Sequence, residues 1–155
     1  MNLPLMIGSK RRFQIRYMSW RDHADVMLIE KASFDHPWTS HDLSSLLAQF
    51  DVRAVVSYID QVVCGFMVYR GVGGCFEILN IAVHEDYRRM GIGKEFIARL
   101  ISMKRTKLLD LFVHEKNLVS QLFFSDCGFI ADEVVSNHFN EGSTAYHMVL
   151  RKEWI

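Results

Sequence analysis

The sequence predicts a single α/β domain with a mixed, largely antiparallel central sheet flanked by about four helices. Two β-rich runs, Val52 to Ile59 and Val62 to Val72, are separated only by Asp60-Gln61, which is typical of a hairpin. Further strand-like runs alternate with stretches whose apolar residues recur at helical spacing. The 155 residues contain no repeat, low-complexity stretch or linker. One domain over residues 1–155 is therefore expected, with residues 1–12 as a flexible N-terminal tail.

The first third of the chain predicts one strand and two helices. Residues 13–17 alternate apolar and polar side chains, and Ser19 can cap the helix that follows. The apolar face expected on this helix consists of Val26, Ile29 and Ala32. Residues 34–38 end it, because proline disfavours helical geometry in the residue before it. Thr39 and Asp42 then form a capping box for a second short helix whose apolar stripe is Leu43, Leu46 and Leu47.

The remaining elements complete the pattern β α α β β β α β α β β. After the hairpin, residues 75–83 form the next strand, and Gly91 and Gly93 open a helix with an apolar stripe over 96–101. A strand at 108–113 and a helix at 118–127 follow, and Gly128 ends that helix. The last two strands, about 130–139 and 144–151, are joined through Asn140-Glu141-Gly142.

Composition disfavours several function classes. Eighteen basic and eighteen acidic side chains cancel, so no nucleic-acid partner is expected. No window approaches the roughly 20 apolar residues of a membrane span, so no membrane partner is expected either. Cys64, Cys75 and Cys127 are odd in number and lie among apolar residues, which predicts reduced core thiols in a cytoplasmic protein. No residues have metal-ligand spacing, and no motif indicates an oligomeric state.

The strongest chemical signal is the glycine pair at 91 and 93. A helix start exposes unpaired backbone N–H groups and favours negative charge, and glycine lets a phosphate approach closely. Arg88, Arg89 and Lys94 add positive charge. A dinucleotide-binding motif would need a third glycine where Phe96 stands, and a P-loop would need glycine at 88. The alternative is a glycine-softened turn with solvated basic residues.

The segment Arg88-Arg89-Met90-Gly91-Ile92-Gly93 resembles the signature of the GNAT acetyltransferase superfamily. Residues 78–83, Tyr87, Asn117 and Cys127-Gly128-Phe129 also look like that family, and the resemblance covers about residues 13 to 151. The fold expected from it is GNAT-like. Among subgroups, the chain is most similar to the ribosomal-protein alanine N-acetyltransferases. Asn80-Ile81-Ala82-Val83 matches that subgroup, and Phe34-Asp35-His36-Pro37-Trp38 resembles its Phe-Pro-Trp element.

The resemblance implies a specific cofactor site. The backbone of Ile81, Ala82 and Val83 would pair with the pantetheine arm of acetyl-CoA. The loop from Arg88 through Lys94 would hold the pyrophosphate, and Asn117 would touch the cofactor as well. The reaction implied is acetyl transfer to a primary amine, with a protein N-terminal α-amine as the favoured acceptor and Phe34 and Trp38 as acceptor-binding residues. A small amine is the alternative, because Asn137-His138-Phe139 matches the subgroup's Asn-Tyr-Tyr element only in part.

The chain departs from the subgroup in its proton-handling residues. The positions of the subgroup's glutamate base and tyrosine acid hold Phe112 and Phe124. Glu77 is a candidate base instead, because histone-type members carry their glutamate at the matching strand position and an apolar setting would raise its pKa. Other candidates for the base are His84, Asp110 and His114, and candidates for the acid are Tyr146 and His138. A further hypothesis is a non-catalytic acyl-CoA-binding module that lost turnover.

Overall fold

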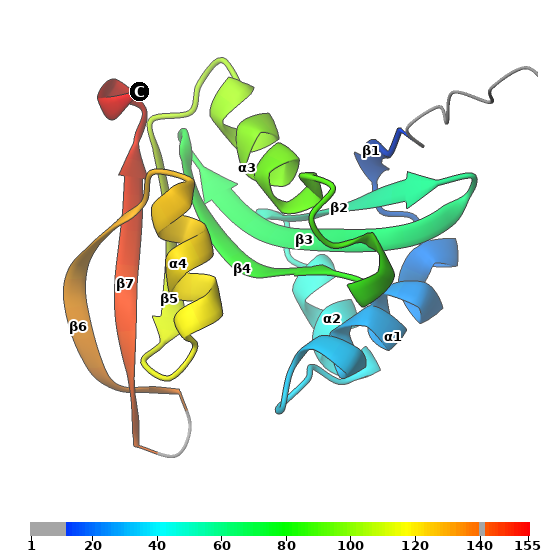
Figure 1. Ribbon diagram of the computed structural model, residues 1–155, viewed down its shortest axis with the longest axis horizontal. Helices are drawn as coiled ribbons and strands as arrows, with labels where there is room; N and C mark the ends of the chain where they lie inside the picture. The colour runs from blue at the N-terminus through cyan, green and yellow to red at the C-terminus, as the bar shows by residue number, and fades with distance from the viewer. Residues whose placement is uncertain (1–11, 140–141) are drawn as a thin grey trace, which may run out of the picture.

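The computed structural model describes residues 12–139 and 142–155, which form a seven-stranded sheet in the order β1-β2-β3-β4-β5-β7-β6 (Figure 1). Of the predicted tail, residues 1–11 lie outside the described residues, as do positions 140 and 141 of the last turn. The strands are β1 (Gln14–Tyr17), β2 (Val52–Ile59), β3 (Val62–Val72), β4 (Cys75–Val83), β5 (Leu108–His114), β6 (Ile130–Phe139) and β7 (Ser143–Arg151). The α-helices are α1 (His23–Ser33), α2 (Ser40–Leu47), α3 (Ile92–Ser102) and α4 (Leu118–Asp126).

The sheet is antiparallel except at one pair of strands. β4 and β5 are parallel, whereas β1 to β4 pair antiparallel in sequence order and β7 lies antiparallel between β5 and β6. The predicted fold class and element order are therefore confirmed. Asp60 and Gln61, with φ of 48° and 69°, form the predicted two-residue turn of the β2–β3 hairpin. The predicted capping box of α2 is present, with Thr39 Oγ1 accepting from the amide of Asp42.

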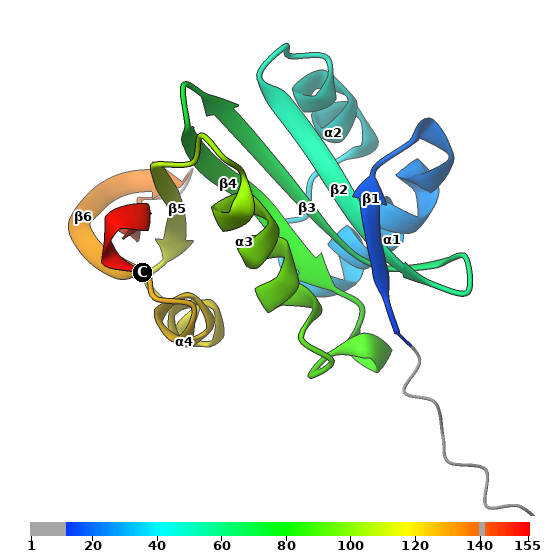
Figure 2. The ribbon, with the colours of Figure 1, turned by 90° about the horizontal axis from the view of Figure 1, so that it is seen from above.

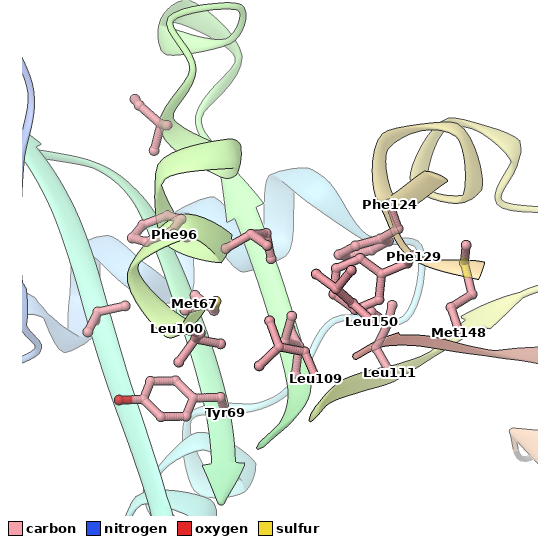
Figure 3. Close-up of a cluster of buried hydrophobic side chains, with 14 of the residues drawn as sticks. Met67, Tyr69, Phe96, Leu100, Leu109, Leu111, Phe124, Phe129, Met148 and Leu150 are labelled. Atoms are coloured by element: carbon pink, nitrogen blue, oxygen red, sulfur yellow. The ribbon is translucent and has the colours of Figure 1, made fainter. Parts of the chain in front are cut away.

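The helices divide between the two faces of the sheet. Figure 2 shows α1 and α2 on one face and α3 and α4 on the other. The face under α1 and α2 buries a cluster around Val56, Phe66 and Val68. The opposite face holds the larger cluster, in which α3 and α4 contribute Phe96, Leu100 and Phe124 over β3, β4, β5 and β7 (Figure 3). Each strand of the centre thus has a buried apolar row on the α3–α4 face.

The structure corrects two predicted core positions. Ala32, expected on the buried face of α1, is exposed, and the buried residues of this helix are Val26, Ile29 and Glu30. Residues 26, 29 and 30 lie three and four positions apart, so they share one side of a helix, whereas 32 falls outside it. Cys64 is buried as predicted, but Cys75 is exposed at the first position of β4. Among the described residues, no helix is long and apolar enough to cross a membrane.

Candidate active site

The site begins where β4 and β5 stop pairing. Their parallel pairing covers only Cys75 to Glu77 on β4 and Leu108 to Asp110 on β5. Beyond these positions the two strands diverge (Figure 1). The edge of β4 from residue 78 to 83 therefore has no partner strand on the β5 side within the described parts of the chain. Unpaired strand edges present backbone groups that can bind an extended ligand.

A bulge on β4 sets which side chains face α1 and α2 next to this opening. Val68 pairs with Asn80 and Tyr69 pairs with Ile78, so Leu79 is an extra residue. Ile78 joins the core under α3, whereas Asn80 hydrogen-bonds a residue of α1 on the other face. Glu77 lies two residues before the bulge and also faces away from the α3 side, since its neighbours Phe76 and Ile78 both belong to that core.

The chain turns sharply between β4 and α3. Arg89 and Gly91 have φ of 62° and 85°, in the left-handed region, and Gly91 is the N-cap of α3. Ile92, the first residue of the helix, is 2% exposed and fixes this helix end to the core. The first N–H groups of α3 lack acceptors within the helix, so they are available for an anion next to the unpaired edge of β4.

The two glycines of the loop serve different purposes. A Cβ on Gly91 would meet no atom within 4 Å, so the space next to this backbone is open to a ligand. A Cβ on Gly93 would lie 2.9 Å from the ring of Phe123 on α4. Gly93 therefore permits close packing of α3 on α4, and of the two glycines only Gly91 borders open space.

The charged and polar residues of the predicted cofactor site lie in this loop and at the start of α4. Arg89, Met90 and Lys94 are exposed, and Arg88 Nε donates to the carbonyl of Val83 at 3.1 Å, which ties the loop to the end of β4. Asn117 is the N-cap of α4, where its Oδ1 accepts from the amide of Ser120 at 3.1 Å. The structure thus brings the β4 edge and the helix start together.

Comparison with known protein families identifies the family of this chain. The sequence model described as Acetyltransferase (GNAT) family matches residues 23–129, which include both strands of the opening and the loop between them. The chain belongs to the GNAT acetyltransferase family. It is therefore an acetyl-CoA-dependent acyltransferase, and acetyl transfer to an amine is its reaction class.

Relatives with the same fold act on different acceptors. The chain is 22% identical over 142 residues to an uncharacterized N-acetyltransferase of Methanocaldococcus jannaschii, covering 89% of this chain and 91% of that protein. The ribosomal-protein-S18-alanine N-acetyltransferase of Escherichia coli superposes with a TM-score of 0.80 at 21% identity, over 90% and 94% of the two chains. Ard1 of Thermoplasma volcanium gives 0.81 at 25% identity, over 90% and 97%. A spermidine/spermine N-acetyltransferase of Vibrio cholerae gives 0.71 at 14%, over 91% and 93%.

Glu77 occupies the point where this GNAT opening begins. Its side chain is 32% exposed, and Arg70 Nε lies 3.4 Å from its Oε2. That Nε is buried and donates no hydrogen bond among the described residues, so Arg70 holds the carboxylate only loosely. Partial burial raises the pKa of Glu77, an effect that the charge of Arg70 opposes and the charge of Asp110 increases. A raised pKa makes this carboxyl group a stronger proton acceptor than an ordinary surface glutamate.

The two phenylalanines differ in their surroundings. Phe112 lies on the Glu77 face of the sheet, where its ring stacks on His138 with a centroid distance of 3.9 Å. Phe124 lies on α4 and is 4% exposed in the large core, where it packs edge-on against Phe129. Neither residue can transfer a proton.

The other predicted proton carriers do not converge on one point. The Nδ1 atoms of His84 and His114 accept backbone N–H groups of their own turns, from Asp86 and Lys116. Tyr146 packs against the α3–α4 core, whereas His138 lies on the opposite face of the sheet. Asp110 faces the same side as Phe112 and hydrogen-bonds His147, a residue that the sequence did not single out.

The sequence prediction also missed Glu30, which links the segment between α1 and α2 to β4. Glu30 is 2% exposed; its Oε1 accepts from the amide of Trp38 at 2.8 Å and its Oε2 accepts from Nδ2 of Asn80 at 2.7 Å. Asn80 Oδ1 in turn accepts from the amide of Ile81 at 2.9 Å. Burial raises the pKa of Glu30, and these two hydrogen bonds oppose that rise. The sequence does carry a signal for the burial of Glu30: it lies four residues after Val26, so both side chains are on the same side of α1.

Phe34 and Trp38, predicted to bind the acceptor, are both half-buried against the cluster under α1 and α2. Their segment joins α1 to α2 and is fixed by the Glu30–Trp38 hydrogen bond. Elsewhere, a surface hollow of about 650 Å³ lies between α2 and the start of β2 and is lined by Trp20, His23 and Arg53 among others. It shares no residue with the predicted site. Within the described chain, no cluster of three or more His, Cys, Asp or Glu side chains has metal-binding geometry.

Proposed function

We propose that this protein acetylates the N-terminal α-amine of a protein, with Glu77 accepting the proton of the amine directly or through one water. The observation that carries this proposal is the position of Glu77. It lies at the point where β4 and β5 diverge, on the same face of the sheet as the segment between α1 and α2. In this arrangement, cofactor and acceptor approach Glu77 from different sides.

The proposed cofactor contacts use this chain's backbone. Ile81, Ala82 and Val83 carry the unpaired β4 edge along which the pantetheine arm would lie. The helix start from Gly91 to Lys94, with Arg88, Arg89 and Met90 before it, would bind the pyrophosphate. The open space at Gly91 fits a phosphate there, because a Cβ would meet no protein atom. Asn117 at the start of α4 completes this set.

The chemistry balances with one proton acceptor in the protein. The neutral amine attacks the thioester carbonyl carbon, a C–N bond forms, and the C–S bond breaks. The proton lost by the amine goes to Glu77 or its water, and the leaving thiolate takes a proton to become the thiol of coenzyme A. A thiol of pKa about 8.5 leaves without a dedicated acid, which is consistent with Phe124 at the subgroup's tyrosine position.

A protein α-amine fits a carboxylate base better than an alkyl amine does. The pKa of an α-amine is about 8, so a useful fraction is neutral near pH 7.5, whereas an alkyl amine such as lysine has a pKa about 2 units higher. The similarity of Phe34 to Trp38 to the Phe-Pro-Trp element of the ribosomal-protein subgroup supports the same acceptor. An acceptor of this kind and three free thiols also support a cytoplasmic location.

A small amine is the second candidate acceptor. His138 and Phe139, which stand where the subgroup has its paired tyrosines, stack on Phe112 and His114 of β5 with centroid distances of 3.9 and 5.6 Å. Rings engaged in this way are less available to a peptide, which favours a smaller substrate.

The test is acetyl-CoA turnover with a panel of N-terminal peptides and polyamines, using wild type, Glu77→Gln and Glu153→Gln. Glu153 is an exposed glutamate at the C-terminal end, so it serves as the matched control. We expect transfer to peptide α-amines, a kcat lowered about 10²-fold in Glu77→Gln, and no change in the control. Preference for polyamines would favour the second candidate. Cofactor binding without transfer to any acceptor would contradict the enzyme proposal and favour a non-catalytic acyl-CoA-binding module.

A further inference from the structure

A row of charged side chains crosses five adjacent strands at the point where β4 and β5 diverge. Its members all lie on the face opposite to α3 and α4, and they come from β3, β4, β5, β7 and β6 in turn: Arg70, Glu77, Asp110, His147 and Asp132. The pairing register places Arg70 beside Glu77 and Glu77 beside Asp110. We call this set the charge row.

His147 is held between two carboxylates in the charge row. Its Nε2 lies 2.9 Å from Asp110 Oδ2 and its Nδ1 lies 2.7 Å from Asp132 Oδ1. Burial would lower the pKa of His147, but the hydrogen bonds to Asp110 and Asp132 outweigh it, so the pKa is raised. An imidazole with both nitrogens engaged by carboxylates is an imidazolium that donates twice. In this protonated form His147 has no lone pair to offer an amine.

Asp110 lies between this cation and Glu77. Residues paired on neighbouring strands are about 5 Å apart, so the Asp110 and Glu77 carboxylates repel each other when both are ionised. The imidazolium donates to Oδ2 of Asp110 and so holds this carboxylate in place. It also carries a positive charge that acts on Glu77 from further away. The two residues thus have opposite electrostatic effects on Glu77.

The groups that face Glu77 come from every neighbouring strand. Arg70 lies on one side, Asp110 on the other, and His147 and His138 lie beyond Asp110. From the helices on this face, Glu30 of α1 is hydrogen-bonded to Asn80 of β4. Phe112 covers the imidazole of His147 at a centroid distance of 4.8 Å and limits the water that can screen these charges.

We infer that Asp110 and His147 are positioning residues that tune the proton affinity of Glu77 in opposite directions. Asp110 increases it, which helps Glu77 to take up the proton of an amine. His147 holds the Asp110 carboxylate in place and limits the increase. This inference rests on the proposed role of Glu77 as base.

The direct test is a titration of the Glu77 carboxyl carbon by ¹³C NMR in wild type, Asp110→Asn and His147→Gln. We expect the midpoint to fall by about 0.5 to 1 unit in Asp110→Asn, because a like charge is removed. We expect it to rise by about 0.5 unit in His147→Gln, because a cation is removed. Asp60→Asn, in the exposed β2–β3 turn, should leave it unchanged.

Shifts of opposite sign in the Glu77 midpoint would distinguish electrostatic tuning from damage to the fold. Damage to the fold gives no reason for the two variants to shift the midpoint in opposite directions. Shifts of the same sign, or no shift in either variant, would overturn the inference. If His147→Gln does not fold, Asp132→Asn replaces it. Asp132 is a carboxylate that lies beyond His147 on β6, so its removal should lower the Glu77 midpoint by less than in Asp110→Asn, and a fall of equal size would overturn the inference.

Kinetics then connect the titration to the reaction. The acidic limb of the pH profile of kcat/KM should move to lower pH in Asp110→Asn and to higher pH in His147→Gln. If wild type transfers acetyl but neither limb moves, the inference fails while the proposed function stands. If wild type transfers acetyl to no acceptor, the proposed function fails, and the NMR titration still decides whether the two residues tune Glu77.

Discussion

The two strands that bound the opening, β4 and β5, differ in how they contribute to the site. β4 offers its backbone edge and carries the bulge at Leu79 and the candidate base Glu77. β5 presents Phe112 where the related subgroup has an acidic base, and its polar contribution comes from Asp110, which is bound to His147 on the next strand. Cofactor binding by backbone groups tolerates changes of side chain. Proton transfer depends on a particular side chain, and the residue that provides it can lie on a different strand in a related protein.

The largest effect is expected from removing the support beneath β4. Glu30→Ala would leave the buried amide of Trp38 and Nδ2 of Asn80 without an acceptor. We expect the free energy of unfolding to fall by about 2–4 kcal/mol, measured by urea denaturation. Glu30→Gln, which keeps one acceptor oxygen, should lose less. An equal loss in both variants would contradict this expectation, because the effect would then come entirely from the second carboxylate oxygen, which both variants lack.

The next effect concerns the backbone binding ascribed to the end of β4. Gly91→Val should raise the KM for acetyl-CoA about tenfold or more, because a branched side chain would fill the space left for phosphate. It should also destabilise the fold by about 1–2 kcal/mol, since φ is 85°. Gly73→Val is the matched control, because Gly73 has φ of 65° and open space but lies in the β3–β4 turn. A similar KM increase in the control would attribute the effect to strain alone.

A third experiment asks whether β5 can regain the base. In a Glu77→Gln background, Phe112→Glu should recover about tenfold of the lost kcat, because a carboxylate at 112 would face the same side as Glu77. Phe112→Gln in that background should recover nothing. If Phe112→Glu recovers no activity, the amine of the acceptor lies too far from β5 for a carboxylate at 112 to reach it. The two strands would then differ in their distance from the amine.

The smallest effect is a dependence of stability on pH. The folded-state pKa of His147 is raised above its ordinary value of 6.5, so its stabilising contribution is present below pH 6.5 and is lost as pH rises through the folded pKa. Because Asp110 and Asp132 are partly exposed, we expect no more than about 1 kcal/mol. Denaturation curves from pH 5 to 9 should show this loss in wild type. The loss should be absent in His147→Gln.

The sequence predicted the fold closely because its signals are local. The bounds of β2, β3 and β4 agree with the structure, since runs of β-branched and aromatic residues end there at turns that need left-handed residues. The loop at Gly91 was also recognised from a local signal, its closely spaced glycines and basic residues. The roles of its residues as cofactor ligands, and of Glu77 as base, stay predictions.

The charge row was not predictable in the same way. Asp110 was noticed because it shares a face with Phe112, two residues away. His147 lies 37 positions along the chain, and only the pairing of β5 with β7 brings it to Asp110. Glu30 was overlooked because an acidic residue in a helix normally faces water, although its spacing from Val26 placed it on the buried side.

The bulge in β4 makes the length of this strand as important as its composition. Side chains alternate along a regular strand, so Glu77 and Asn80, three positions apart, would face opposite ways; the bulge at Leu79 lets both face the α1 side. Deleting Leu79 would restore strict alternation and keep both residues on that face, but it would remove the bend that a bulge adds to the strand, directly after its pairing with β5 ends. An apolar side chain of similar size can replace leucine at 79, where it packs against the cluster under α1 and α2. The extra residue itself is what descendants of this sequence must keep.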